Sequence, residues 1–600
     1  MRSLSWIGLT CVHAVVAFFN ALTLYGYYYW NLQDTYLNVL LVSFQIGLPL
    51  ENGRAVAIVH IIMAVLHGFC ILLMLGGSIW NRSLAFTPWA SCTAEVKTEE
   101  VKSSDRTRSR ITRSFTTVYA KVSDRHGLLG VNGRHFHTIQ LCRELVETTL
   151  QTRQAYRMSM LLRRALLNRI YVVLIVMNCW APAIVNTWLF KGDEACKRYT
   201  IILSDCALNL ISYVGVAIIV IVGYTGDYDL TLWGFDYLTW YNELQMVIVV
   251  SWMDLATRSI FSLSLIATTT NMKELLQRLP HKKNRIGQSV FTAPSSFDIA
   301  TIKTIPSTRG RFFCYDSKLL AQFEKLTLHS GHILFGIWGA VVLAFHIQAS
   351  TQPLLSQCLI HVRPWGVSRP SCFLAGLDCY TLGISGLADE VDKDWSEFDS
   401  FAVVQVLIRH CPALEVPARL SEFHSLRAIK VYNTTIVDWG KSAALTSTNH
   451  PNLLSLFLIR VNMTDGVLPA GFLTPDFPPS VYDVEFCVSN LRELPDDLDT
   501  KWLTTSEPGT GNPITEIPPG VFEIDNTYLI GISDLDIQEL PRNVTKLSVG
   551  LAWAFMRGTN VSFFWDWAVS SLPSGGGMFH SLFYEDSINA ISTPPQLITV

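Results

Sequence analysis

The chain has 600 residues, of which 50% are hydrophobic and only 16% are charged, and its mean hydropathy is +0.29. Ordinary globular domains carry about 25% charged residues, so this composition excludes a conventional soluble protein and indicates a membrane protein. The net charge of −3 conceals a division, because residues 1–350 hold 32 Lys and Arg against 21 Asp and Glu, whereas residues 351–600 hold 14 against 28. Since the positive charge lies in loops between apolar segments, no nucleic-acid partner is expected.

Five segments contain the roughly 20 apolar residues that a bilayer crossing needs. They are residues 6–30, 56–79, 170–190, 201–223 and 331–349. A sixth segment, residues 245–270, is doubtful because Asp254 and Arg258 lie at i and i+4 in its middle. It either crosses with this pair neutralised or lies along the membrane surface.

The predicted fold is therefore an α-helical polytopic membrane domain of five or six spans, followed by an α/β leucine-rich-repeat solenoid. The predicted parts, in chain order, are two N-terminal membrane helices (1–79), a basic cytoplasmic loop with a membrane-proximal helix (80–168), membrane helices including the doubtful segment 245–270 (169–270), a second basic cytoplasmic loop (271–330), the last membrane helix (331–350), a Cys-containing cap (351–402), about seven leucine-rich repeats (403–555) and an irregular C-terminal tail (556–600).

Orientation follows from the distribution of Lys and Arg, which collect in cytoplasmic loops. Residues 80–168 hold 15 basic against 7 acidic residues, and residues 271–330 hold 10 against 4. Five spans, with residues 245–270 at the interface, place both loops inside and residues 351–600 outside. The acidic stretch 224–244 then lies on the cytoplasmic side, which is the weakness of this arrangement. We expect a plasma-membrane protein with its C-terminal region outside.

Four N-x-Ser/Thr sequons in the C-terminal region agree with an exterior location, because such acceptors are used on the lumenal side. They begin at Asn433, Asn462, Asn543 and Asn560. Chance sequons are common, so the pattern alone does not establish glycosylation. A fifth sequon, at Asn81, lies in a predicted cytoplasmic loop and is expected to be unused.

An internal repeat begins at Val403 and follows the pattern L-x-x-L-x-L-x-x-N/C-x-L. Its four clear copies start at Val403, Leu426, Leu453 and Val481, at intervals of 23, 27 and 28 residues. Weaker copies follow near Asn512, near Ile530, and at Val544 to Val549. Such repeats stack their strands into a solenoid, whereas an irregular sandwich would not need a recurrent Leu-Pro after the strands.

Outward strand residues of such repeats usually form the binding surface. The predicted binding face comprises Arg409, His410, Lys430, Tyr432, Phe457, Arg460, Glu485, Ser533 and Asp534. Large rings and guanidinium groups are typical interface anchors, although a solvated strand face would carry similar residues. The expected ligand is an extracellular protein or glycan, and the lipid bilayer is the other partner.

Cys358, Cys372, Cys379 and Cys411 precede or begin the first repeat. In an oxidising exterior, two disulfides among them are expected to cap the solenoid, and their spacing leaves three pairings open. No cofactor or metal is expected, because the nearby His361 does not provide a paired ligand spacing.

Seven longer stretches carry a resemblance to a known family. They are ELVETTLQTRQAYRMS, NCWAPAI, LQMVIVVSWMDLATRSIFSLSLIA, CLIHVRPWGVSRPSC, LRAIKVYNTTIVDW, FCVSNLRELPDDLDTKW and NVSFFWDW. Over about residues 130–570 the chain resembles a family of oomycete polytopic membrane proteins with a C-terminal leucine-rich region. The resemblance implies a membrane domain followed by leucine-rich repeats and no catalysis. The chain departs from that family at its tail, where no Cys follows Cys487.

Motifs of catalytic chemistry are absent from the sequence: there is no P-loop, G-x-S-x-G, H-E-x-x-H or kinase signature. We therefore expect a non-enzymatic, receptor-like protein that binds a protein or glycan. The alternative is a channel or transporter regulated by its repeat domain, because polar residues are costly in lipid and often functional. The candidates for that role are His60, His67, Asp205, Asp254 and Arg258.

Overall fold

The computed structural model describes residues 2–32, 47–80, 82, 84–86, 136–187, 194–224, 228–229, 234–235, 243–276, 310–481, 483–502, 511–525, 527, 529–548, 551 and 553–570. Most of the two predicted basic loops, the sequon at Asn81 and the tail beyond residue 570 lie outside these residues.

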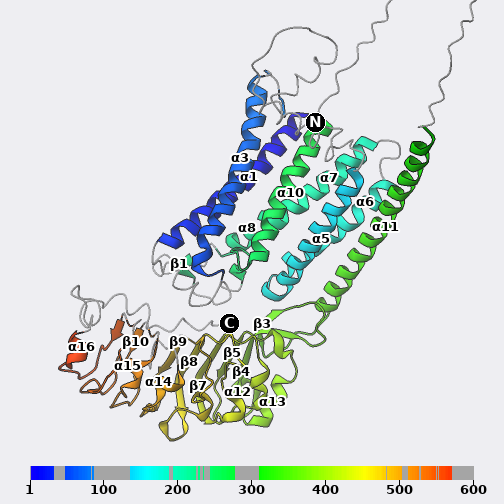
Figure 1. Cartoon of the computed structure of the whole chain (residues 1–600). Coiled ribbons are helices and arrows are strands. Elements are labelled where there is room, and N and C mark those ends of the chain that lie inside the picture. The colour runs from blue at the N-terminus through cyan, green and yellow to red at the C-terminus, as the bar shows by residue number, and fades with distance from the viewer. Residues whose placement is uncertain are drawn as a thin grey trace, which may run out of the picture.

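The N-terminal part is a bundle of long helices that run side by side (Figure 1). The helices are α1 (Arg2–Leu32), α3 (Gly53–Trp80), α5 (Phe136–Leu161), α6 (Ala165–Thr187), α7 (Glu194–Leu210), α8 (Val216–Gly223), α10 (Trp252–Leu276) and α11 (Gly310–Ser350). A π-helical turn, η2 (Ile211–Gly215), joins α7 to α8, so these three form one helical path. The short η1 (Leu50–Asn52) precedes α3, and β1 (Tyr228–Asp229) pairs antiparallel with β2 (Gly234–Phe235).

Four of these helical paths are long and apolar enough to cross a membrane. They contain residues Ser3–Tyr28, Gly53–Trp80, Arg198–Gly223 and His329–Ser350. The apolar part of α6 is shorter, Ala165–Ala181. The chain is therefore a membrane protein by the length and composition of its helices.

The structure places both α5 and α10 inside the bundle. Helix α5, expected to lie beside the membrane in a cytoplasmic loop, packs against α6, α10 and α11. Helix α10, the doubtful segment, packs against α1, α3, α5 and α7, which agrees with the alternative of a helix among the spans with its charged pair neutralised and not with the surface alternative. Both helices carry buried polar side chains, including Glu147 and Gln151 on α5 and Ser262 and Thr268 on α10. The hydropathy of each segment alone argues against burial, but these polar groups find partners on neighbouring helices.

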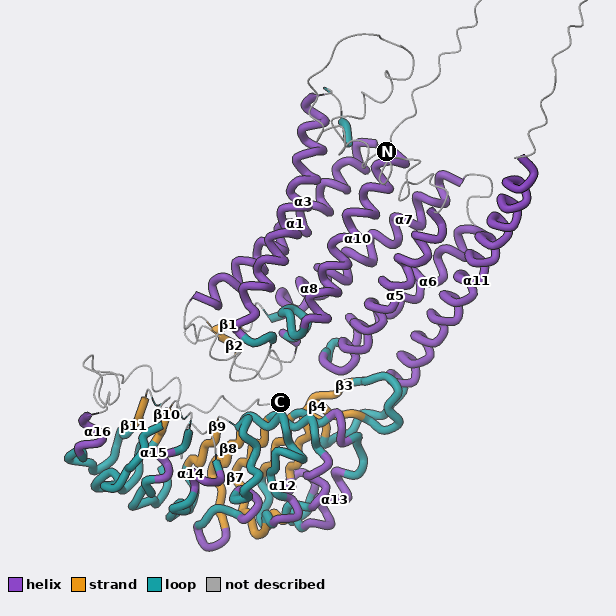
Figure 2. Tube along the Cα trace, viewed as in Figure 1, coloured by secondary structure: helices purple, strands orange, loops and turns teal. Residues whose placement is uncertain are grey.

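The C-terminal part contains a seven-stranded mixed sheet with short helices along one of its faces (Figures 1 and 2). Its strands are β3 (Cys358–Val362), β4 (Ser371–Asp378), β5 (Gln405–Arg409), β6 (Leu414–Glu415), β7 (Ala428–Asp438), β8 (Ser455–Met463) and β9 (Asp483–Cys487). The order is β3-β4-β5-β7-β8-β9, with β6 paired to β7. Only the β3–β4 pair is antiparallel.

Short helices and helical turns lie between the strands, and one, α16, follows the last strand. They are α12 (Cys379–Leu382), α13 (Ala388–Trp395), η3 (Ser400–Ala402), η4 (Ala418–Glu422), η5 (Lys441–Ala443), η6 (Thr464–Gly466), η7 (Ala470–Phe472), α14 (Leu498–Lys501), α15 (Gly520–Glu523) and α16 (Asp566–Ser570). A separate two-stranded parallel sheet follows, formed by β10 (Leu529–Gly531) and β11 (Trp553–Phe555).

The register of the parallel strands is regular. Gln405 pairs with Ala428, Ala428 with Ser455, and Ser455 with Asp483, so successive partners are 23, 27 and 28 residues apart. The same intervals separate the apolar positions of the sequence pattern. Alternate strand residues point into one continuous hydrophobic core that extends from β3 to the residues around Met556.

Two asparagine side chains, the buried Asn512 and the half-buried Asn490, satisfy backbone groups of the last strands of the sheet. Asn512 donates from Nδ2 to the Phe486 carbonyl (2.6 Å) and accepts the backbone N–H of Ser489 at Oδ1 (2.8 Å). Asn490 makes the corresponding pair of bonds with the N–H and carbonyl of Met463 (2.7 and 2.8 Å). An unpaired buried backbone group is costly, so these two amides stabilise the turns after β8 and β9.

Three boundaries differ from the sequence prediction. Strand β4 lies within the predicted cap but pairs in parallel with β5 as part of the same sheet. The last predicted copy, at Val544 to Val549, contains no strand in its described residues, and the parallel partner of β10 is Trp553–Phe555. The described part of the predicted irregular tail, residues 556–570, packs on the domain: Trp565 and Trp567 lie against the core and donate to the carbonyls of Leu540 and Pro541 (both 2.9 Å).

The loop between β3 and β4 contacts the helix bundle. The backbone N–H of Arg363 donates to the Ser159 carbonyl of α5 (3.1 Å), and its guanidinium donates to the Ser350 carbonyl at the end of α11 (2.7 Å). Trp365 is nearly buried and belongs to the hydrophobic cluster of the bundle. The sheet therefore joins the bundle at the ends of α5 and α11.

Candidate functional site: the strand face and the polar core of the helices

The strand face comprises the side chains of β5, β7, β8 and β9 that alternate with the core residues, together with the residue directly after Arg409, Tyr432, Ile459 and Cys487. Most of these side chains are exposed or half-buried, whereas Leu407 and Ile459 are buried. Strand register aligns Leu407, Lys430, Phe457 and Glu485 in one row. A second row contains Arg409, Tyr432, Ile459 and Cys487. Most of the predicted binding residues thus lie in neighbouring rows of one surface.

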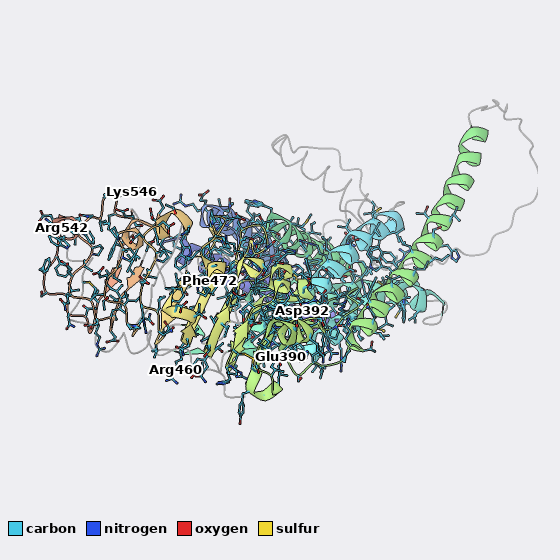
Figure 3. All side chains as sticks on the ribbon, turned by 90° about the horizontal axis from the view of Figure 1, so that it is seen from below. Glu390, Asp392, Arg460, Phe472, Arg542 and Lys546 are labelled. Carbon is cyan, nitrogen blue, oxygen red and sulfur yellow. A yellow bond between two sulfur atoms is a disulfide. The ribbon has the colours of Figure 1, made fainter. Side chains whose placement is uncertain are left out.

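Aromatic and cationic side chains contact one another across the strand face. Arg460 lies over the ring of Tyr432, with its Cζ 5.9 Å from the ring centroid, and Nη1 donates to the Tyr432 hydroxyl (3.3 Å). His410 meets the same ring edge-on at 5.9 Å, and its Nδ1 is 3.0 Å from Nδ2 of Asn433. Arg460 projects from the side of the domain, whereas Phe472 lies within it (Figure 3). These contacts hold the anchors in fixed positions.

Charged side chains border this aromatic group. Arg409 forms an ion pair with Asp378 of β4, Nε to Oδ2 at 2.8 Å. Lys430 places its ammonium 6.0 Å from the ring centroid of Phe457, and burial lowers the pKa of this lysine although Glu485 acts against that shift. The face therefore combines cations, rings and one carboxylate, which suits a polar extended ligand.

A left-handed residue directly follows the second row on each of its four strands. His410, Asn433, Arg460 and Val488 have φ values of 56°, 46°, 53° and 54°, and Asp534 after β10 has 54°. Non-glycine residues adopt such values infrequently, so four occurrences at one register position mark a repeated local geometry.

The remaining predicted residues of the face lie elsewhere. Ser533 and Asp534 follow β10, which belongs to the separate two-stranded sheet. The carbonyl of Ser533 accepts the Gly511 N–H (3.2 Å), and the Asp534 N–H donates to the Arg557 carbonyl (2.6 Å). These two residues therefore extend the surface but do not join the two main rows.

All four sequon asparagines in the C-terminal part are exposed: Asn433, Asn462, Asn543 and Asn560. The four cysteines form two disulfides, Cys358–Cys372 and Cys379–Cys411. The first joins β3 to β4, and the second joins α12 to the chain just after β5. Both cross-links lie at the end of the sheet that contacts the helix bundle.

Helix α10 presents polar side chains to two different helix pairs. On one side, Ser262 lies 3.1 Å from Nε2 of His67, whose Nδ1 is 2.9 Å from Nδ1 of His13. Lys273 is 3.2 Å from Nε2 of His13. His60 is seven residues before His67 on the same buried face of α3 and lies 2.8 Å from Asn20.

On its other side, α10 contacts a buried carboxylate pair. Asp205 accepts from Arg143 at 2.6 Å, and Glu147 lies 3.0 Å from the same guanidinium. The amide of Asn209 donates to Glu147 (2.7 Å) and lies 3.3 Å from Asp205, while the hydroxyl of Ser264 donates to Glu147. One arginine thus serves two carboxylates, and the excess negative charge is stabilised by hydrogen bonds.

Asp254 and Arg258, which made the sixth segment doubtful, form an ion pair of 3.4 Å within α10. Arg157 of α5 also pairs with Asp254, at 3.1 Å. Arg258 donates to the carbonyls of Met246 (3.2 Å), Val247 (2.8 Å) and Ile248 (2.8 Å). Arg258 therefore caps the backbone just before α10, which explains how a charged residue is accommodated there.

Sequence analysis identified His60, His67, Asp205, Asp254 and Arg258 but missed their main partners. Those partners are Asn20 for His60, Ser262 for His67, Arg143 and Asn209 for Asp205, and Arg157 for Asp254. Arg143 and Glu147, at i and i+4, were a sequence signal, but they lie in the segment that was predicted as a membrane-proximal helix of a cytoplasmic loop and not as part of the bundle. Among the described residues, no three or more His, Cys, Asp or Glu side chains are grouped to hold a metal.

No protein-family model and no curated protein matches the chain.

Proposed function

We propose that the chain is a non-enzymatic, multi-pass membrane protein whose C-terminal part is a leucine-rich-repeat domain that binds an extracellular protein or glycan through the strand face. The observation that carries this proposal is the alignment of Arg409, Tyr432, Lys430 and Phe457 in adjacent rows by strand register. Rigid rings and guanidinium groups on a solvent-facing surface are the usual anchors of recognition.

The repeat interpretation has two supports. The parallel strands recur at intervals of 23, 27 and 28 residues, within the range of 20–29 known for leucine-rich repeats. The left-handed residue recurs at the position after the second row. Each repeat then stacks on the next, and the continuous core is shared between repeats.

We propose a topology in which seven helical paths of the described bundle cross the membrane. In Figure 1, α3 ends and α5 begins at the same end of the bundle as the N-terminus, as do the end of α10 and the beginning of α11. Residues 87–135 and 277–309, both basic, connect these elements. The acidic residues 224–244 connect α8 to α10 at the other end, toward the sheet. This arrangement satisfies the positive-inside rule without the conflict that five or six spans leave.

Glycosidase sensitivity of the expressed full-length protein tests the exterior location. A mobility shift on deglycosylation that is lost when Asn433, Asn462, Asn543 and Asn560 are all changed to Gln supports it. Asn452→Gln is the control, because Asn452 is exposed and lies outside any sequon. The exterior location is contradicted if no shift occurs and if Cys358, Cys372, Cys379 and Cys411 of the native protein can be alkylated from the cytoplasm.

Binding through the strand face is tested separately. Full-length protein in nanodiscs is screened against arrays of oligosaccharides and extended peptides, and the hits are titrated. Tyr432→Ala and Arg460→Ala each remove an exposed or half-exposed anchor and should weaken binding about tenfold or more. Asn452→Ala, outside the strand face, should leave the affinity unchanged. Equal affinities for all three variants contradict the assignment of the surface.

A channel or transporter is the second candidate function, favoured by the polar side chains that α10 presents to both of its neighbours. Such groups are costly inside a membrane domain unless they are paired or functional. A solute flux in proteoliposomes that disappears in His67→Leu or Asp205→Asn protein would favour this function over simple anchoring. If these polar groups serve only helix packing, wild-type protein in proteoliposomes should show no solute flux.

A further inference from the structure

A cavity of about 30 Å³ lies between α5, the π-helical turn η2 and α10. Its polar lining includes Arg153, Arg157, Ser212, Asp254 and Arg258. A buried water needs about 10–15 Å³ of such space, so the cavity accommodates two or three waters or one small ion. Turns of π-helix occur frequently at functional sites, and η2 forms one wall of this cavity.

The charge of the lining is unbalanced. Three guanidinium groups, those of Arg153, Arg157 and Arg258, face a single carboxylate, that of Asp254. Asp254 is shared between Arg157 at 3.1 Å and Arg258 at 3.4 Å. The nearby Glu243 does not compensate, because it pairs with Arg164 at 2.9 Å.

The three cations are not equivalent. The donors of Arg258 are directed to backbone carbonyls and to Asp254, so this residue is structural. Arg157 also donates to the Gln245 carbonyl (3.0 Å) and is mostly buried. Arg153 is exposed, and no hydrogen bond or ion pair of its side chain to another described residue is found. Together the three guanidinium groups and the one carboxylate leave two positive charges uncompensated around a cavity of the helix bundle, which is costly.

We propose that this cavity binds one small monovalent anion of the size of chloride or nitrate, with Arg153 and Arg157 as its ligands. The anion would balance one of the two excess positive charges, and the five N–H groups of each guanidinium suit anion coordination. The proposal concerns the helix bundle and stands whether or not the strand face binds a ligand.

Thermal unfolding of the full-length protein in uncharged maltoside micelles tests the proposal, with intrinsic tryptophan fluorescence as the signal. Sodium chloride or sodium nitrate replaces sodium gluconate at constant ionic strength, since gluconate is too large for the cavity. We expect a saturable rise in the midpoint, because a ligand that binds only the folded state stabilises it. Arg153→Gln and Arg157→Gln should each increase the apparent Kd about tenfold or more, the effect of losing one charge-assisted contact.

Arg163→Gln is the matched control. Arg163 is exposed in the link between α5 and α6 and does not line the cavity, so its loss removes the same charge without removing a ligand. Arg153 is exposed and its side chain forms no hydrogen bond or ion pair within the described part of the chain, so Arg153→Gln should fold and keeps the test interpretable if Arg157→Gln does not. No saturable response to chloride or nitrate, or an equal change in Arg163→Gln, overturns the proposal. Stabilisation by phospholipid alone would also overturn it, because the ligand would then be a lipid phosphate.

Discussion

Replacing Asn512 with Ala should destabilise the end of the sheet more than any surface substitution. The side chain is 3% exposed. It satisfies the Phe486 carbonyl (2.6 Å), the Ser489 N–H (2.8 Å) and the Ser489 hydroxyl (2.8 Å). Since β9 is the last strand of the seven-stranded sheet, no further strand can replace these bonds. Each buried backbone group left unpaired costs about 1–3 kcal/mol, so two groups give a loss of about 2–4 kcal/mol after partial hydration.

Hydrogen exchange of the full-length protein in detergent micelles, followed by mass spectrometry, measures this effect locally. Amides of residues 483–491 should exchange about 30-fold to 700-fold faster in Asn512→Ala, because each 1.4 kcal/mol corresponds to a factor of ten. Asn452→Ala, an exposed asparagine before β8, should change exchange little. If both variants exchange at the wild-type rate, the buried amide does not support the strand end and the reasoning is refuted.

Three further predictions concern other parts of the chain. Burial raises the pKa of Asp394 to about 6; because this exceeds the unfolded value of about 3.9, the stability that the protonated form contributes is present below about pH 4 and lost as the pH rises through about 6. Asp394→Asn should therefore make the thermal midpoint less dependent on pH between those values and should raise the midpoint at neutral pH. A dependence on pH identical to that of the wild type would contradict this. Gly471→Ala should lower the midpoint, because a Cβ there would lie 2.6 Å from Cδ1 of Trp439 and 2.9 Å from its carbonyl oxygen, and an unchanged midpoint would show that Trp439 can move aside. Arg143→Gln should destabilise the helix bundle by about 3–5 kcal/mol, because Asp205 and Glu147 would be left without a cation. Denaturant unfolding measures this effect, and a midpoint equal to that of the wild type would exclude the role of Arg143.

Hydropathy along the chain predicts the apolar helices well, because a span such as Gly53–Trp80 is apolar over its whole length and needs no partner to be recognised. The intervals between parallel strands also follow from the sequence alone, since Leu426, Leu453 and Val481 recur with the strand pattern. Local patterns of this kind depend on the residue types themselves and not on distant contacts.

Other features were decided by contacts between segments far apart in the chain. Helix α5 carries too many polar residues to be recognised as a bundle helix by itself, and α10 could only be named a doubtful span. The place of both helices depends on pairs such as Arg143 with Asp205 and Arg157 with Asp254. The register that places Arg409 beside Tyr432, and the choice among three disulfide pairings, likewise required the folded sheet. A sequence thus determines which segments are apolar or repetitive, whereas the partner that neutralises a buried charge is set only when tertiary packing brings two helices together.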